Sequence, residues 1–495
     1  MEGIILGIFQ AINFLTLSAI ALGVVTGIVV GGIPGLTVSM AIVLALPFSF
    51  HMPPDVGMAF LIGIYTGGMC GGSISAILLN IPGNPAAVIT GEDGYPMALK
   101  GEAGKALGTS IIASAVGSMV SFFALAFAAP QIANLAIEFG APELFGLVFF
   151  GMTLICAFSS NGKIIKGLIA GLLGLMFMTI GMDPIDATPR FTFDTLQLKY
   201  GVSFIPVMIG LFAIPEMLKQ VHQKAIEKGR LEHLGKFPSF LDIARLLKRM
   251  IISGLIGTGV GAVPGTGSAV AAVLSYEFAR NTSKDKKKFG TGIPEGIAAA
   301  EAANNGVTGG ALIPMLTLGI PGDPPTAVML GALMIYGLEP GPLLFIMNPE
   351  FIQGILGSLF ISIVFLVFIG LLTARLYIKV LLVPKQVLWP VIGVLCVLGS
   401  YALRNSLFDA MVMLFFGLIG YALKRNGYPI LPIIISVVLG PTLEVNLRRS
   451  LLLSDGNPMI FLGNPICMTF ILLGIAFVLT ITILPGRKKK KETGG

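Results

Sequence analysis

The phrase Ile81-Pro82-Gly83-Asn84-Pro85 and its second copy, Ile320-Pro321-Gly322-Asp323-Pro324, each stand near the middle of an apolar stretch. Proline removes a helical hydrogen bond, and glycine takes backbone angles that other residues adopt only at a cost. Asn or Asp followed by proline then favours the start of a new helix. Each copy therefore predicts a helix that stops, turns and begins again inside a membrane.

A further Pro-Gly phrase precedes each copy, within residues 31–39 in the first case and 261–268 in the second. Broken backbone is tolerated in a membrane only where protein or a water-filled cavity satisfies its N–H and C=O groups. Interruptions at corresponding places in two halves of a chain indicate the binding site of a secondary transporter. For any single break, the alternative is a kink that serves helix packing.

Composition agrees with a membrane location. Of 495 residues, 55% are hydrophobic and 12% are charged, which is too little charge to cover a soluble globule of this size. The net charge of +7 comes from basic residues in short loops and in the stretch 487–491, as expected for cytoplasmic loops and not for nucleic-acid binding. The four cysteines show no metal-binding spacing, so we expect neither metal nor disulfide. No cleavable signal peptide is evident at the N-terminus.

Matching motifs recur in the two halves, and the loops between them indicate how each half is oriented in the membrane. Pro34 matches Pro264 at a distance of 230 positions, and Pro82 matches Pro321 at 239. The extra residues belong to the basic loop 280–288, whose counterpart 51–55 has no Lys or Arg. The loops after the breaks show the opposite bias, so corresponding loops should face opposite sides of the membrane. We expect an all-α polytopic membrane protein with inverted-topology repeats and helices broken at Pro-Gly motifs near the midplane.

The expected domains follow from this pattern. Residues 1–218 form the first transmembrane repeat half, 219–249 a basic cytoplasmic linker, 250–486 the second half with additional C-terminal helices, and 487–495 a basic cytoplasmic tail. Arg448 and Arg449 do not fit the charge rule, because this count places them outside. Either residues 428–441 do not cross the membrane or these arginines have another task.

The breaks also predict a binding site. A helix that begins inside the membrane points backbone N–H groups and a positive dipole end at the gap, which suits a carboxylate. Small polar side chains flank these gaps, although such residues also hold membrane helices together. The residues expected to bind substrate are Pro34, Gly35, Thr37, Ser39, Asn80, Pro82, Gly83, Asn84, Pro264, Gly265, Thr266, Gly267, Ser268, Pro321, Gly322 and Thr326.

Asp323 is the foremost candidate for ion coupling. An ionisable residue at membrane depth is a functional candidate, and unwound carbonyls beside a carboxylate commonly form sodium sites. Helix capping alone is the alternative for Asp323 and for Asn84 at the matching position. The expected ion-coupling residues are Asp323, Asn304, Asn305 and Thr317. We expect Glu295 and Glu301 to be ordinary interfacial carboxylates rather than proton carriers.

Several long phrases carry a family resemblance. They are GGIPGLTVSMAIVLALPF, GGMCGGSISAILLNIPGNPAAVITGEDGYPMALKGEAGKALG, GALIPMLTLGIPGDPPTAVMLGALMIYGLEPGP and PTLEVNLRRSLLLSDGN. In this order and spacing, the chain resembles the large membrane subunit of the tripartite tricarboxylate transporter family, nearly end to end. The resemblance implies a bacterial inner-membrane secondary transporter that imports citrate or related tri- and dicarboxylates. It also implies a small membrane subunit, a periplasmic substrate-binding protein and a Na+ or H+ gradient, with no other cofactor.

Three other functions make different demands on the sequence. An enzyme acting within the membrane is disfavoured because the sequence has no H-E-x-x-H and no G-x-S-x-G motif. An internal ATP motor is excluded by the absence of a Walker sequence. A passive anion channel differs from the transporter in one expectation, since its uptake would be indifferent to the sodium gradient.

Overall fold

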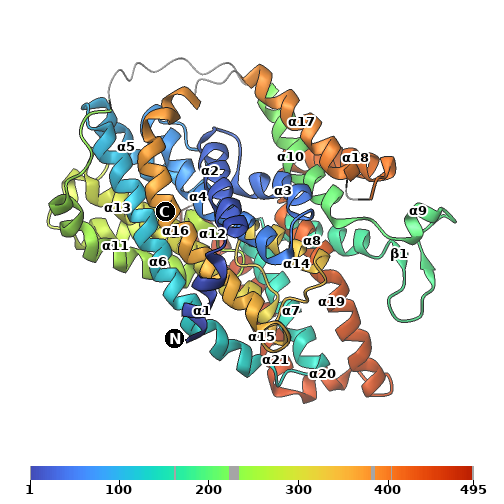
Figure 1. Ribbon diagram of the computed structural model, residues 1–495. Coiled ribbons are helices and arrows are strands. Elements are labelled where there is room, and N and C mark those ends of the chain that lie inside the picture. The colour runs from blue at the N-terminus through green and yellow to red at the C-terminus, as the bar shows by residue number, and fades with distance from the viewer. Residues whose placement is uncertain (1, 161–162, 222–233, 381–384, 403, 493–495) are drawn as a thin grey trace. The chain divides into compact units, whose positions relative to one another are not determined.

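The computed structural model describes residues 2–160, 163–221, 234–380, 385–402 and 404–492 (Figure 1). These residues form α-helices, one short 3-10 helix and one two-stranded hairpin. Residues 222–233 of the expected linker and 493–495 of the expected tail lie outside the described residues. The chain divides into two compact units, one formed by Met1–Ala133 with Glu216–Gly399 and the other by Asn134–Pro215 with Ser400–Gly495.

The first unit contains both helix breaks. Its elements are α1 (Glu2–Ala11), α2 (Phe14–Gly32), α3 (Val38–Ser49), α4 (Pro54–Leu79), α5 (Ala87–Leu99), most of α6 (Ala103–Ala136), α11 (Phe240–Gly261), α12 (Gly267–Thr282), η1 (Lys286–Lys288), α13 (Pro294–Leu318), α14 (Pro324–Ile335), α15 (Pro342–Met347), α16 (Pro349–Val380) and most of α17 (Lys385–Ala402). Helix α11 begins at Phe240, inside the stretch expected to be linker, because Ser239 and Asp242 form a capping box there.

The second unit consists of helices and the two-stranded hairpin, and a cluster of ion pairs joins the hairpin to one of these helices. Its elements are α7 (Ala141–Phe158), α8 (Ile164–Met178), β1 (Gly181–Met182), β2 (Pro189–Arg190), α9 (Leu196–Lys199), most of α10 (Phe204–Val221), α18 (Leu407–Arg425), α19 (Leu431–Leu453), α20 (Met459–Gly463) and α21 (Pro465–Glu492). The strands pair antiparallel, with Gly181 opposite Arg190. The segment from β1 to α9 extends away from α8 and α10 (Figure 1).

Seven helices in the described part of the chain are long and apolar enough to cross a membrane. They are Phe14–Gly32, Pro54–Leu79, Ala103–Ala136, Ala141–Phe158, Pro349–Ala374, Leu407–Arg425 and Leu431–Leu453. The last of these includes residues 431–441 of the stretch 428–441 whose crossing the sequence left open, so α19 has the length and composition of a span. The expectation of an all-α polytopic membrane protein is confirmed.

Within the first unit, two helix pairs approach closely at corresponding positions. Helix α2 packs on α4, and α11 packs on α13. A Cβ on Gly27 would lie 2.4 Å from the carbonyl oxygen of Ile64, and a Cβ on Gly257 would lie 2.1 Å from that of Ala303. Gly27 and Gly257 differ by 230 positions, and Ile64 and Ala303 by 239. The offsets found in the sequence thus recur in the packing, which small residues permit.

Candidate functional site

Both long helices stop where the Pro-Gly phrases predict. Helix α4 ends at Leu79 and α13 ends at Leu318. The next residue is left-handed in each case, with φ of 55° at Asn80 and 68° at Gly319. The following N–H then turns back to the helix, from Ile81 to the Ser75 carbonyl and from Ile320 to the Pro314 carbonyl. All three pairs of positions differ by 239, so the two breaks share one backbone design.

Glycine is required in each break because another chain segment lies against it. A Cβ on Gly83 would lie 2.2 Å from the Gly31 carbonyl oxygen, and a Cβ on Gly322 would lie 2.5 Å from that of Gly261. Each break therefore rests on the end of the helix that precedes the earlier Pro-Gly phrase. The second break is tied further, since the Gly265 N–H donates to the Gly322 carbonyl at 2.9 Å.

The residues after the glycines cap the new helices. Asn84 Oδ1 accepts from the Ala87 N–H at 2.9 Å. Asp323 Oδ1 accepts from the Thr326 N–H at 3.0 Å, and Thr326 Oγ1 accepts from the Asp323 N–H, which completes a capping box. Capping by both residues agrees with the sequence interpretation. It also means that the N–H groups of Ala87 and Thr326 already have partners and are not free for a substrate carboxylate.

Asp323 has a second contact that capping does not explain. Its Oδ2 accepts from the Tyr65 hydroxyl at 2.6 Å, and both side chains are buried. Tyr65 lies on α4, the helix before the first break, whereas Asp323 starts the helix after the second break. In the part of the chain that the structure describes, no Lys, Arg or His pairs with this carboxyl. Its charge is therefore balanced by hydrogen-bond donors alone.

The amides of Asn304 and Asn305 join α13 to α4. Asn304 Nδ2 donates to the Met69 carbonyl at 2.9 Å, and Asn84 Nδ2 donates to the same oxygen at 3.3 Å. Asn305 Nδ2 donates to the Thr66 carbonyl at 3.3 Å. Thr66 and Asn305 are equivalent positions at an offset of 239, so this contact joins the two repeats at matching places.

Three buried oxygens at this junction have no hydrogen-bond partner among the residues that the structure describes. They are Thr66 Oγ1, Asn304 Oδ1 and Asn305 Oδ1. A buried polar atom without a partner costs roughly 1–3 kcal/mol, so such a group usually meets water or an ion. Neutral oxygens beside interrupted helices are the ligands that sodium finds in transporters. The three neutral oxygens are of the kind that bind sodium; they belong to Asn304 and Asn305, which are among the predicted ion-coupling residues, and to Thr66, which the sequence interpretation did not assign.

Thr317 lies apart from this junction. Its hydroxyl donates to the Ile313 carbonyl one turn back on α13, at 2.7 Å. Such a bond is ordinary for threonine inside a helix. The structure thus connects Thr317 to its own helix and not to the other three predicted ion-coupling residues.

The two earlier Pro-Gly phrases differ in how their helices begin. Thr37 caps α3 by accepting from the Met40 N–H at 3.2 Å, and Pro34 and Ser39 are buried near it. Thr266 instead donates its hydroxyl to the Val260 and Val263 carbonyls, and no side chain caps α12. The predicted residues there are half-buried and partly accessible: Pro264, Gly265, Thr266, Gly267 and Ser268. Helix α12 therefore begins at half-buried residues and without a side-chain cap.

A cavity of about 320 Å³ opens beside the first break. Asn80 and Pro82 line it together with residues of α5, among them Glu92 and Tyr95. The described residues that line it include an acidic side chain and no Lys or Arg. By contrast, Pro321, Gly322 and Asp323 of the second break are buried. The two breaks share a backbone design but differ in access.

Glu301 is a residue that the sequence interpretation considered and took for an ordinary interfacial carboxylate. Glu295 behaves as expected of an interfacial carboxylate, because it is partly exposed and pairs with Arg249 at 2.8 Å. The same expectation was wrong for Glu301, whose exposed fraction is 0%. Its carboxylate accepts from Thr90 on α5 and, at 3.1 Å, from Ser114 on α6. An acidic residue in the alanine-rich run 298–303, followed directly by two asparagines, was the available signal.

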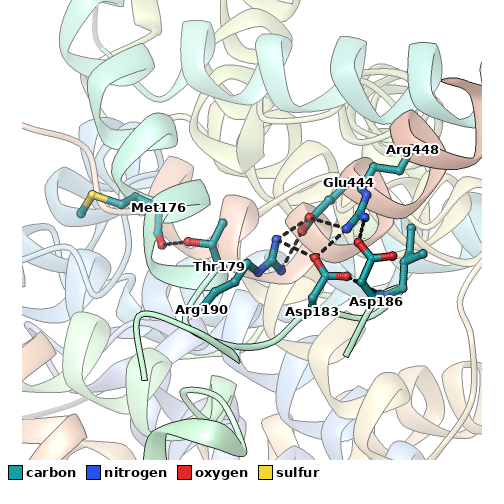
Figure 2. A network of polar contacts seen from close by, with 8 residues as sticks. Met176, Thr179, Asp183, Asp186, Arg190, Glu444 and Arg448 are labelled. Atoms are coloured by element: carbon teal, nitrogen blue, oxygen red, sulfur yellow. Dashed lines mark hydrogen bonds and ion pairs between the residues drawn. The ribbon is translucent and has the colours of Figure 1, made fainter. Parts of the chain in front are cut away.

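Arg448 belongs to an ion-pair cluster in the second unit, shown in Figure 2. It pairs with Asp183 at 2.6 Å and also with Asp186. Arg190 forms two hydrogen bonds to Glu444, at 2.6 and 3.2 Å, and lies 3.4 Å from Asp183. The backbone N–H groups of Asp186 and Ile185, followed by Arg448, lower the pKa of Asp183 to about 2. The cluster joins the hairpin to α19, so Arg448 has ion-pair partners within the protein, while Arg449 is exposed.

Together, these observations define an almost entirely helical, multi-pass membrane protein in which two helices are interrupted at matching positions. The family model described as the tripartite tricarboxylate transporter TctA family matches residues 17–435. The chain belongs to this family, whose members are the large subunit of the transporter. Membership implies a transport protein rather than an enzyme, and a tripartite system implies partner subunits.

Two relatives from Agrobacterium vitis are similar to this chain. The "Uncharacterized 52.8 kDa protein in TAR-I ttuC' 3'region" is 36% identical over 471 residues, which cover 95% of this chain and 93% of the relative. The "Uncharacterized protein in TAR-II ttuC' 3'region" is 36% identical over 236 residues, covering 48% of this chain and 97% of the relative. No solved structure matches the chain.

Proposed function

We propose that the protein is the transmembrane subunit of an ion-gradient-driven secondary transporter in a bacterial inner membrane. Its substrates would be citrate or related tri- and dicarboxylates, received from a periplasmic binding protein. A small membrane subunit would complete the complex. Family membership supports the tricarboxylate class, and the second copy of the helix break supports secondary transport.

One observation carries the ion dependence. Tyr65 contacts Asp323, and at the junction of α4 and α13 three buried oxygens of described residues lack partners. A cation placed there would satisfy oxygens that the protein leaves open and would balance the Asp323 carboxylate. Thr66, Asn304 and Asn305 would hold it with neutral oxygens, and Asp323 would supply negative charge nearby.

The substrate is expected beside the Pro-Gly segments that remain accessible. Asn84 and Asp323 already cap their own helices, so these starts are less suited to a carboxylate than the sequence alone predicts. Residues 264–268 are half-buried, and α12 begins there without a side-chain cap. Backbone N–H groups at such a start favour an anion. We therefore assign the first carboxylate contact to Gly267 and Ser268.

The test is uptake of labelled citrate into proteoliposomes that contain the purified complex and its binding protein. Sodium and proton gradients are imposed separately, with matched membrane potential. The proposal expects accumulation above the outside concentration with at least one gradient and none without. Uptake that only equilibrates, whichever gradient is present, would identify a passive channel. Recovery of chemically altered citrate would instead favour an enzyme.

A further inference from the structure

Asp93 is a buried carboxylate on α5, and its hydrogen-bond donors among the described residues all belong to the second repeat. Its exposed fraction is 0%. Oδ1 accepts from the backbone N–H groups of Gly290, Gly292 and Ile293 at 2.9, 2.8 and 3.0 Å. Oδ2 accepts from the Tyr276 hydroxyl on α12 at 2.8 Å. One side chain from the helix after the first break therefore holds the loop that joins α12 to α13.

This loop, residues 283–293, is shaped to receive the carboxylate. Gly290 and Gly292 have φ of 81° and 101°, angles that favour glycine, and with them three N–H groups converge on one oxygen. On the other side of the carboxylate, a Cβ on Gly296 would lie 2.1 Å from Asp93 Oδ2. The contact therefore leaves no space for a larger residue at the start of α13.

The same loop forms part of the wall of the cavity beside the first break. Gly290 lines this cavity of about 320 Å³ together with Asn80 and Pro82 of the break. A second contact lies at the end of α5, where Lys100 Nζ donates to the Thr291 carbonyl at 2.7 Å. If the loop moved away from α5, the cavity would lose this wall and the first break would become more accessible.

Helix α5 is flanked at both ends by backbone that can bend. It follows the Pro82-Gly83 break and ends shortly before Gly101, whose φ is 80°. Hinges of conformational changes are a few residues at the ends of elements, often small ones. The 13 residues of α5 can thus move as one body, and the hydrogen bonds to Asp93 oppose such movement.

We propose that Asp93 is the positioning residue of a gate: it holds α5 against the loop 283–293, and the two separate to let substrate pass the first break. The inference rests on the proposed function, because a gate requires a substrate that passes. The loop carries Lys284 and Lys286–Lys288, which the charge pattern predicts to be cytoplasmic, so the gate would face the cytoplasm. Opening needs no change of protonation, since water replaces the N–H and O–H donors of the carboxylate.

A cysteine at position 87 reports whether the gate is open. Ala87 lines the cavity and is fully buried, so Ala87→Cys should react slowly with N-ethylmaleimide while the loop is in place. Ala213→Cys, at an equally buried position on α10, reports general loosening of the protein. The four native cysteines are buried, and the unsubstituted protein gives their background.

In purified protein, removal of the contacts of Asp93 should speed the reaction at position 87. We compare Tyr276→Phe, which removes one donor, with Asp93→Asn, which removes the charge, and Asp93→Ala, which removes the acceptor. Loss of one hydrogen bond to a charged group should raise the rate about tenfold or more, because the rate follows the population of the open form. Glu102→Gln, at an exposed carboxylate just after α5, is the control and should leave the rate unchanged. Position 213 should respond to none of these substitutions.

A second measurement distinguishes a gate from a fixed contact that only caps the start of α13. It uses proteoliposomes in which Asp93 is intact and the reporter cysteine is at position 87 or 213. Citrate together with the gradient that drives its uptake should speed the reaction of Ala87→Cys, because the gate opens in every cycle. The reaction of Ala213→Cys should not change.

The outcomes separate this inference from the proposed function. If the Ala87→Cys protein takes up citrate and its reaction rate does not change, the gate is overturned and the transporter remains. Absence of uptake by wild type under every gradient would overturn the proposed function, and the gate with it. An unchanged rate in folded Tyr276→Phe and Asp93→Asn variants would refute the role of Asp93, even if Asp93→Ala does not fold. Equal acceleration at position 213 would show general loosening and would refute it as well.

Discussion

The contact between Tyr65 and Asp323 gives the sharpest test of the paired breaks. Asp323→Asn keeps an oxygen that can accept from the Thr326 N–H, and Asn caps helices about as well as Asp. What the substitution removes is the charge that strengthens the 2.6 Å bond from the Tyr65 hydroxyl. Hydrogen bonds to charged groups contribute about 1.5–3 kcal/mol, so Asp323→Asn should lower the free energy of unfolding by no more than this.

Tyr65→Phe removes the same bond from the other side. It leaves Asp323 Oδ2 buried without its donor, which costs about 1–3 kcal/mol. If the pair acts as a unit, the double variant should be less destabilised than the sum of the single variants, with a coupling energy of about 1–2 kcal/mol. Unfolding of the purified protein in mixed micelles, followed by tyrosine and tryptophan fluorescence, measures all four corners of this cycle.

Sodium dependence of citrate uptake then separates capping from ion coupling. We expect Asp323→Asn to raise the sodium concentration that half-saturates citrate uptake by at least tenfold while the protein stays folded. Asp55→Asn, at an exposed carboxylate in the first turn of α4, is the control and should leave both properties unchanged. A coupling energy below about 0.5 kcal/mol together with full sodium dependence in Asp323→Asn would show that Asp323 is only a cap.

Three further predictions concern other parts of the chain. Gly83→Ala and Gly322→Ala should each lower carboxylate affinity measured by calorimetry. Because an added Cβ would lie 2.2 and 2.5 Å from a backbone oxygen, each substitution should also cost about 1–3 kcal/mol of stability. Wild-type affinity in both variants would contradict a site at the breaks. The pKa of Asp183 is lowered from 3.8 to about 2, so its stabilisation of the hairpin is complete above about pH 4 and is lost as the pH falls through about 2. A spin label on the hairpin should therefore stay immobile at pH 4, and mobility at that pH would refute this prediction. On intact cells, an impermeant reagent should label single cysteines placed in 51–55 but not those placed in 284–288. Equal labelling of the two loops would exclude inverted repeats.

The fold was predictable where the determining chemistry is local. Proline and glycine act on their own backbone, so the ends of α4 and α13 follow from residues 81–85 and 320–324. Capping by Asn84 and Asp323 was predictable for the same reason. The inversion of the repeats across the membrane stays a prediction, because loop charge is its only support.

The site was less predictable because its contacts join distant segments. Tyr65 and Asp323 are 258 positions apart, and Arg448 and Asp183 are 265 apart. No pattern within one helix indicates such partners. Glu301 shows the limit most clearly, since its position near the start of α13 suggested an interface, whereas packing by α5 and α6 removes it entirely from solvent.

Under the proposed function, the buried carboxylates explain why transport should be coupled to an ion gradient and should not be passive. Near the breaks, Asp323 and Glu301 are both buried and acidic, and no described Lys or Arg pairs with either. A citrate carboxylate 4 Å from one of them would be repelled by about 4 kcal/mol at an effective dielectric constant near 20. Entry of the anion therefore becomes favourable only when cations occupy these groups first. A sodium ion beside Asp323 would remove the repulsion from that carboxylate, and its departure would restore the repulsion and expel the substrate.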